Sequence, residues 1–204
     1  MPDLTAVMGQ VLRALREFGH ERIELEIRLG HKAGAFRPGV DAQAWARLKA
    51  ALDAGQGWSV AHSVTTEQID ASGSKVVLGQ DQKPLKVVHK RRLADTDYDT
   101  DSPWCARVSL SLEEPGSVQE TIVTTYERRK ERWSYAFKCW TVDLTRVAGN
   151  LPHQLDEDTE SYEVEIELAD TREFFTRTVD SILQWGWDLA ADMCRLLEHG
   201  AAAG

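Results

Sequence analysis

The sequence predicts a mainly β protein of the α+β class: a closed eight-stranded antiparallel β-barrel with a charged lumen, flanked by packing helices. Three observations predict it. About eight segments alternate polar and aliphatic residues at a period of two, which puts the two kinds on opposite strand faces. Acid-lined and base-lined segments are nearly balanced, so inward charges can pair, and three apolar helices can cover the outside. An ordinary sandwich, with its charged faces in water, is the alternative.

The chain of 204 residues is long enough for one well-packed domain. We expect residues 1–200 to form it, with a frayed tail at 201–204. Apolar residues at helical spacing predict a helix at 3–19 and a C-terminal helix at about 171–199, and the barrel strands lie between them, over about 22–169. Asp41 is the expected N-cap of a further helix that ends near Asp53.

Charge and cysteine content restrict the function classes. No run of 18 apolar residues occurs, so we expect an intracellular protein with neither a membrane span nor a signal peptide. Cys105, Cys139 and Cys194 are odd in number and form no CxxC pair, which favours reduced thiols over a zinc cluster. The net charge of -9 argues against a general nucleic-acid binder. A phosphate end can still be bound if the basic residues converge in one cavity.

Two stretches near the ends of the chain carry acids at every second position. Glu24 and Glu26 lie in the first, and Glu163, Glu165 and Glu167 lie in the second. On an open sheet these carboxylates would only repel one another. Turned inward and facing each other, they form a set of oxygen ligands of the kind that Mg²⁺ or Mn²⁺ requires.

Basic residues follow the same period on other strands. The stretch from Leu85 to Leu93 places Lys86, Lys90 and Arg92 on one face, and a strand predicted from Gln119 to Phe137 also places three cations on one face. Three neighbouring cations repel unless an anion lies between them, and a triphosphate is such an anion. The predicted cations of this second strand are Arg128, Lys130 and Arg132.

The segment Asp95 to Pro103 is predicted to be an acidic loop. It superficially matches a calcium-binding EF-hand loop, but position six is Thr100 and position twelve is Ala106. The glycine and the bidentate glutamate that such a loop needs are both missing, so we expect no calcium site there.

Five motifs together resemble a known family, the metal-dependent RNA triphosphatases of mRNA capping in the triphosphate tunnel metalloenzyme superfamily. The resemblance runs from about Glu24 to Leu168, and the motifs stand in the family's order. They are Glu24-Leu25-Glu26-Ile27-Arg28, Arg107-Val108-Ser109-Leu110-Ser111-Leu112-Glu113, Arg128-Arg129-Lys130-Glu131-Arg132-Trp133-Ser134-Tyr135, Trp140-Thr141-Val142-Asp143-Leu144-Thr145 and Glu163-Val164-Glu165-Ile166-Glu167.

The resemblance implies a role for each charged residue. Glu24, Glu26 and Glu167 would be the metal ligands, for Mn²⁺ or Mg²⁺, and Arg28 would support them. Glu163 and Glu165 would orient the attacking water and bind basic neighbours. The phosphate oxygens would be held by Arg107, Arg128, Lys130 and Arg132, together with Lys90 and Arg92, and these cations would be braced by Asp143, Glu113 and Thr145.

The implied activity is removal of the γ-phosphate from the 5′-triphosphate end of nascent mRNA in a triphosphate tunnel, the first step of capping. A separate guanylyltransferase would be needed, and the expected location is the nucleus, or the host cell if the protein is viral. No membrane is implied, and a homo-oligomer is compatible with the sequence. Two alternatives stay open: a tripolyphosphatase or thiamine-triphosphatase of the same superfamily, and a non-catalytic module that binds triphosphate ends or inositol phosphates.

Overall fold

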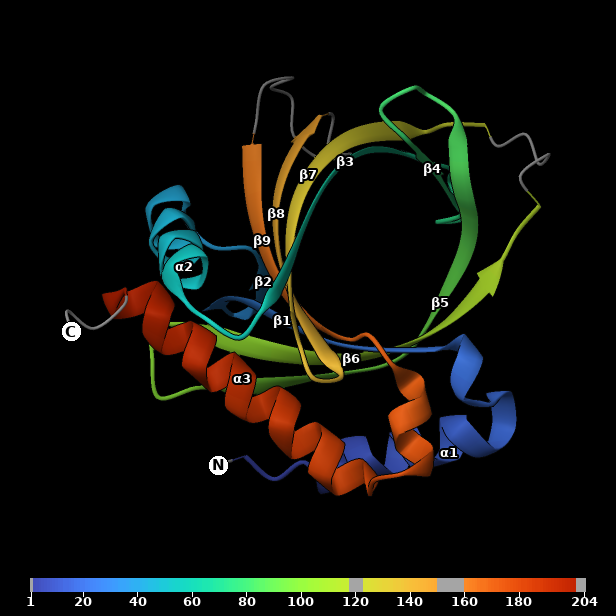
Figure 1. Ribbon diagram of the computed structural model, residues 1–204. Helices are drawn as coiled ribbons and strands as arrows, with labels where there is room; N and C mark the ends of the chain where they lie inside the picture. Colours follow the sequence, from blue (N-terminus) through green and yellow to red (C-terminus); the bar gives the residue numbers. More distant parts are fainter. Residues whose placement is uncertain (1, 118–122, 150–159, 201–204) are drawn as a thin grey trace.

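The computed structural model describes residues 2–117, 123–149 and 160–200 and consists mainly of one sheet that closes on itself (Figure 1). Eight antiparallel strands form the barrel in the order β1-β6-β5-β4-β3-β7-β8-β9, and pairing of β9 with β1 closes it. The short β2 adds a hairpin to β1. The strands are β1 Ile23–Ala33, β2 Ala35–Pro38, β3 Ser59–Ile69, β4 Lys75–Leu78, β5 Pro84–Asp99, β6 Cys105–Pro115, β7 Tyr126–Phe137, β8 Trp140–Gly149 and β9 Glu160–Leu168.

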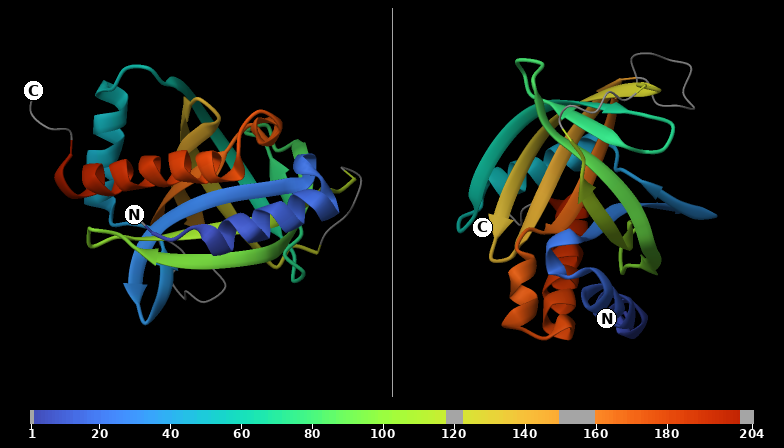
Figure 2. Two further views of the ribbon diagram at one scale, coloured as in Figure 1. Left: turned by 90° about the horizontal axis from the view of Figure 1, so that it is seen from below. Right: turned by 90° about the vertical axis from the view of Figure 1, so that its right-hand side faces the viewer.

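Three α-helices cover part of the outside of this barrel. They are α1 Thr5–Phe18, α2 Ala42–Ala54 and α3 Val179–His199, with short 3₁₀ turns at His20–Arg22 and Thr171–Phe175. As predicted, α2 begins at Asp41, whose carboxylate accepts a hydrogen bond of 2.7 Å from the Ala44 amide. Figure 2 shows α1 and α3 lying next to each other beneath the barrel. No helix among the described residues has the length and apolar character needed to cross a bilayer.

The predicted closed eight-stranded antiparallel barrel with flanking helices is confirmed, but several element boundaries differ. The expected acidic loop at Asp95–Pro103 is wrong in its first half, because β5 continues to Asp99 and pairs there with β6. The strand expected from Gln119 begins at Tyr126. The C-terminal helix begins at Val179, after the 3₁₀ turn, because Thr178 caps it there. The frayed tail at 201–204 and the loop around Pro152 lie outside the described residues.

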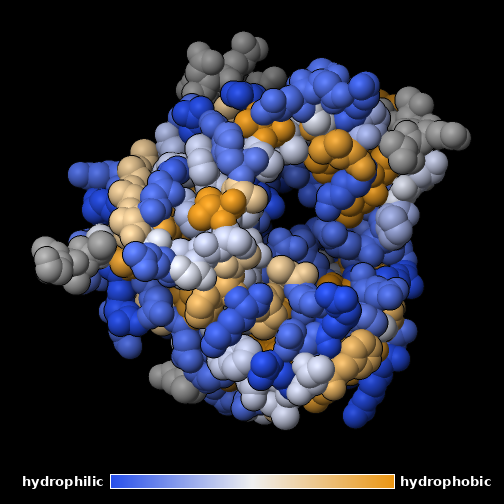
Figure 3. Space-filling view, in the orientation of Figure 1, coloured by the Kyte–Doolittle hydropathy of each residue, from blue (hydrophilic) through white to orange (hydrophobic). Residues whose placement is uncertain are grey.

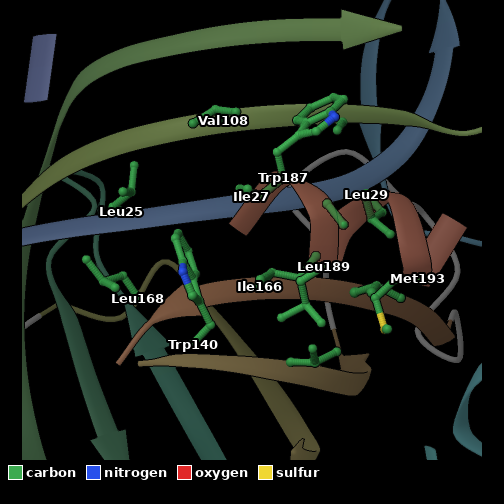
Figure 4. Close-up of a cluster of buried hydrophobic side chains, with 14 of the residues drawn as sticks. Leu25, Ile27, Leu29, Val108, Trp140, Ile166, Leu168, Trp187, Leu189 and Met193 are labelled. Carbon is green, nitrogen blue, oxygen red and sulfur yellow. The ribbon is translucent and has the colours of Figure 1, made fainter. Parts of the chain in front are cut away.

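The hydrophobic core lies outside the barrel, between the strands and the helices. Alternate residues of β1 and β9, such as Leu25 and Ile166, point outward and are fully buried against α3. Figure 4 shows Ile166 next to Leu189 of the helix, with Met193 in the same cluster. The other face of each strand is therefore free to carry charge toward the lumen.

One glycine lets α3 approach the barrel closely. A Cβ at Gly186 would lie 2.5 Å from the ring of Trp140, which is 2% exposed at the start of β8. Both sides of this contact are packed, so neither can shift cheaply. Gly186 is thus needed for helix packing and not for an unusual backbone conformation.

Gly186→Ala is expected to lower the free energy of unfolding by about 1–3 kcal/mol, because the added methyl group overpacks the contact with Trp140. The matched control is Gly9→Ala within α1, where the nearest atom to an added Cβ is Arg13 Nη1 at 3.9 Å. This control should raise stability by about 0.5–1 kcal/mol through helix propensity. Urea unfolding of the three proteins measures both changes. Equal gains in stability from both substitutions would contradict the packing argument.

Candidate active site in the barrel lumen

The barrel encloses a cavity of about 430 Å³ whose walls are mostly charged. Figure 3 shows the lumen as a dark opening in the face of the molecule. Each barrel strand turns alternate residues into it, as the period of two requires. The charged lining residues are Glu24, Glu26, Arg28, Glu67, Lys75, Lys86, Lys90, Arg92, Glu113, Arg128, Lys130, Arg132, Glu163, Glu165 and Glu167.

The three predicted metal ligands meet where the barrel closes. Glu26 of β1 lies directly opposite Glu167 of β9 in the strand register, and Glu24 is two residues away on the same face. Burial, then the negative charges of Glu24 and Asp143, raise the pKa of Glu167 to about 7. Burial and the neighbouring Glu165 likewise raise the pKa of Glu26. This part of the lumen thus holds more negative charge than its own cations balance, and a cation would relieve the excess.

The donor set fits a hard divalent cation chemically, since it consists of carboxylate oxygens. Two of these three carboxylates are paired with cations of the chain. Lys90 pairs with Glu24, and the Nη1 atom of Arg92 lies 3.2 Å from Glu26 Oε1. Among the described residues, no three side chains of suitable type converge on one point as a ready metal site. Binding of a metal ion by this set would therefore displace Lys90.

Three cations of β7 line the lumen in a row, as the sequence predicted. Their neighbours across the β3–β7 register are Ser63, Thr65 and Glu67, two of which are small and leave the cations accessible from the lumen. The partners of the row are all carboxylates or hydroxyls. They are, for Arg128, Glu67 at 2.6 Å and Glu163 at 3.9 Å; for Lys130, Glu163 at 3.2 Å and Glu67 at 3.8 Å; and for Arg132, Asp143 at 2.8 Å, Thr145 at 3.2 Å and Glu165 at 3.4 Å.

The predicted bracing residues lie behind this row. Asp143 and Thr145 of β8 are 3% and 0% exposed and contact Arg132 from the wall. Burial raises the pKa of Asp143, although Arg132 opposes that shift. Glu165 behaves in the opposite way: burial raises its pKa, but Lys130 and Arg132 outweigh this and lower it below its ordinary value. Glu165 is therefore the more firmly ionised of these two carboxyl groups.

Arg107 and Glu113 differ in where they lie relative to the cavity. Arg107 does not line the cavity; it lies at one rim, where it binds Asp97 at 2.6 Å and covers the ring of Phe36. Glu113 lines the cavity and is the register partner of Lys90 on β5. The lumen thus brings together nearly all of the predicted set and leaves Arg107 at its edge.

Sequence reasoning missed Glu67 and Lys75, both of which line the cavity. Glu67 is 6% exposed and contacts Arg128, Lys130 and Lys75. Burial alone would raise its pKa, but Lys130, Lys75 and Arg128 lower the pKa from 4.5 to about 2. The alternation Ser63, Thr65, Glu67 was the available signal, but it is weak because the other face of that strand is also polar.

A buried hydroxyl also points to the lumen as a binding site. Ser111 is fully buried, and its Oγ has no hydrogen-bond partner in the part of the chain that is described. It is the register partner of Glu24 on one side and of Arg92 on the other. Buried polar atoms are nearly always satisfied, so this one indicates a water molecule or ligand at that place.

Another cavity lies outside the barrel. It has a similar volume to the lumen but does not contain the predicted site residues. Trp187 and Cys194 of α3 line it together with the turn after β5. None of the predicted site residues reaches it. The lumen is the better candidate site because acids and bases converge there from seven of the eight barrel strands.

Comparison with known proteins gives one family. The family model described as "mRNA capping enzyme, beta chain" matches residues 67–193, more than half of the chain. The match includes β7, β8 and β9 and begins after β1. The 5′RNA triphosphatase A449R of Paramecium bursaria Chlorella virus 1 is 28% identical over 174 residues, which are 84% of this chain and 88% of the viral protein.

Solved structures show the same fold. The Pct1 RNA triphosphatase of S. pombe superposes with a TM-score of 0.74 and 21% identity over 98% of this chain and 94% of its own. A second structure of Pct1, in complex with the Spt5 CTD, gives the same TM-score and identity over 95% and 94%.

Glu67→Gln is expected to lower the free energy of unfolding by about 2–3 kcal/mol at pH 7, because Arg128 and Lys130 lose a buried ionised partner. The folded-state pKa of Glu67 is depressed, so the contribution is present above about pH 4.5 and is lost as the pH falls toward about 2. The difference between wild type and variant should shrink over that window. Urea unfolding between pH 3 and 7 measures it.

The matched control is Glu127→Gln, an exposed carboxylate on the outer face of β7. It should change stability little and without this pH dependence. A wild-type advantage over Glu67→Gln that stays constant from pH 7 to pH 3 would contradict an ionised Glu67 in the lumen.

Proposed function

The chain belongs to the mRNA capping enzyme beta-chain family, and from this membership we propose that it removes the γ-phosphate from the 5′-triphosphate end of nascent mRNA. The products are a 5′-diphosphate end and inorganic phosphate. The chain is thus a polynucleotide 5′-triphosphatase that acts in the first step of capping. We further propose that residues 1–200 act as one triphosphate tunnel domain.

One observation carries the proposal: a row of three cations lies beside the facing carboxylates of β1 and β9 in the same enclosed lumen. A triphosphate has the charge and length to replace carboxylates as the partner of Arg128, Lys130 and Arg132. Arginine binds phosphate through a planar two-pronged donor, and lysine binds it as a point charge. Phosphoryl transfer needs mainly such positioning and charge stabilisation.

Glu24, Glu26 and Glu167 would hold Mn²⁺ or Mg²⁺, since their oxygens fit a hard cation, and the raised pKa values of Glu26 and Glu167 support an unmet need for positive charge. A divalent cation there supplies Lewis-acid stabilisation of the charge on the transferring group. The identity of the ion, Mn²⁺ or Mg²⁺, is part of this proposal.

The remaining lumen residues act on water and phosphate. Glu163 and Glu165 accept hydrogen bonds from the attacking water and hold it in line with the γ-phosphorus. The water oxygen then bonds to phosphorus while the bond to the β–γ bridging oxygen breaks. Arg132 and Lys130 neutralise the charge that develops on the phosphate oxygens. The enclosed barrel limits bulk water, which strengthens each of these contacts.

Partners and location follow from the reaction. A 5′-diphosphate end is the substrate of a guanylyl transfer step, so we propose a separate guanylyltransferase as the next enzyme. The site of action would be the nucleus, or the host cell for a viral protein. The net charge of -9 supports recognition of the triphosphate end and not of the length of the RNA, since backbone contacts require a basic surface.

Phosphate release from triphosphate-ended RNA, with and without Mn²⁺ or Mg²⁺, tests the proposal. We expect release that depends on the metal and that leaves a 5′-diphosphate end, read out by colorimetric phosphate detection and end analysis of the RNA. Tripolyphosphate and ATP are assayed in parallel. Activity on tripolyphosphate with none on RNA would assign the chain to a different triphosphatase, and binding without any release would indicate a non-catalytic module.

Ala substitution of Glu24, Glu26 or Glu167 is expected to lower turnover about 100-fold or more, equivalent to about 3 kcal/mol of barrier, since each removes a proposed metal ligand. The matched control is Glu160→Ala, an exposed carboxylate on the same strand as Glu167, which should leave turnover unchanged. Steady-state phosphate release at saturating Mn²⁺ measures the effect. A variant of the three that keeps near wild-type turnover is not a metal ligand.

A further inference from the structure

The lumen has two rims, and strand direction decides which residues share one. Both β3 and β5 run antiparallel to β4, so the last residues of these two strands lie at the same rim. Tyr126 pairs with Ile69, the last residue of β3. Arg107 pairs with Asp97, near the end of β5. Tyr126 and Arg107 therefore stand at one rim, named here the Tyr126 rim.

From this rim inward, the lumen face of β7 carries one aromatic residue followed by three cations. The lumen face of the strand presents Tyr126, then Arg128, Lys130 and Arg132. Arg132 contacts Glu165, which is two residues from Glu167, so the carboxylate set lies at the inner end of the row. A triphosphate whose γ-phosphate lies near Arg132 extends its α-phosphate toward Arg128. The nucleoside that follows then emerges at Tyr126.

The opposite half of the lumen has fewer arginine side chains that could bind the phosphates of a nucleotide. Toward the starts of β5 and β3, its lining residues are Lys86 and Ser63. The Tyr126 half carries Arg128, two residues from Tyr126, and Arg28, the register partner of Arg107. The α- and β-phosphates of a substrate are thus better neutralised on the Tyr126 side.

The Tyr126 ring is positioned so that an aromatic ligand can stack on it. It is the one aromatic side chain among the described residues that line the cavity. It is half-buried, and the described part of the chain gives it no ring-to-ring contact. Gly73, which also lines the cavity, has nothing within 4 Å of where a Cβ would lie, so the rim has free space there.

We propose that the Tyr126 rim is the binding site of the first nucleoside of the substrate, with its base stacked on the Tyr126 ring. This inference rests on the proposed triphosphatase function and names the part of the same site that takes the nucleoside. Stacking on an aromatic ring tolerates any base, because every base has a π-face. The rim therefore distinguishes a nucleoside triphosphate end from bare tripolyphosphate without reading sequence.

Kinetics with three substrates test the proposal. Tyr126→Ala should raise KM for triphosphate-ended RNA and for ATP by about 5- to 150-fold, the range that loss of one base stack gives. The change in KM for tripolyphosphate, which has no base, should be much smaller. Tyr126→Phe keeps the ring and should restore the wild-type KM for RNA. Calorimetric binding of ATP and tripolyphosphate without metal should give the same pattern in Kd.

Phe137→Ala is the matched control, because Phe137 ends the same strand at the opposite rim and is 40% exposed on the outer face. It should change none of these values. Equal increases in KM for RNA and tripolyphosphate after Tyr126→Ala would overturn the inference, since Tyr126 would then only position Arg128. An unchanged KM for RNA would overturn it as well. Wild-type protein that releases phosphate from none of the three substrates would overturn the proposed function itself.

Discussion

Charge pairing inside the lumen is the constraint on which the rest of the structure depends. Lys130, Glu26 and Glu67 are only about 5% exposed, and a buried ion without a partner costs several kcal/mol. Each of the three contacts an opposite charge on a different strand. A slip of β3 by one residue along β7 would turn Glu67 outward and break its pairs with Arg128 and Lys130. The pairs therefore fix the strand register, and not only the contents of the lumen.

A charged lumen places the hydrophobic core outside the barrel. The aliphatic faces of β1 and β9 must then be covered, and α3 covers them with Leu189 and Met193. The β3 strand has a different outer face, with His62 exposed and Gln68 half-buried, and its sequence is correspondingly polar on both sides. Helices thus cover the strands whose outer faces are aliphatic, and the strands without helical cover have polar outer faces.

The sequence predicts strands with one aliphatic face better than it predicts strands that are polar on both faces. On β1 and β9 most of the outward face is aliphatic, so alternation indicated both the strand and the inward direction of residues such as Glu26 and Glu165. On β3 both faces are polar, so the inward position of Glu67 depends on its register with Arg128, about sixty residues away. Asp95 and Asp97 have the composition of a turn, yet Arg107 on the neighbouring strand pairs with both and favours an extended chain. Contacts between distant segments decide these positions, and local patterns do not contain them.

Substrate binding in such a lumen must be an exchange of partners. Arg128, Lys130 and Arg132 are already bound to carboxylates, so a triphosphate can reach them only by displacing Glu67, Glu163 or Glu165. Each displaced carboxylate then needs new positive charge, in a region where the raised pKa of Glu167 already indicates too little of it. A triphosphate alone would worsen that deficit, whereas a triphosphate that arrives with a divalent cation restores the balance. The charge distribution of the lumen therefore favours joint binding of the two over binding of either one.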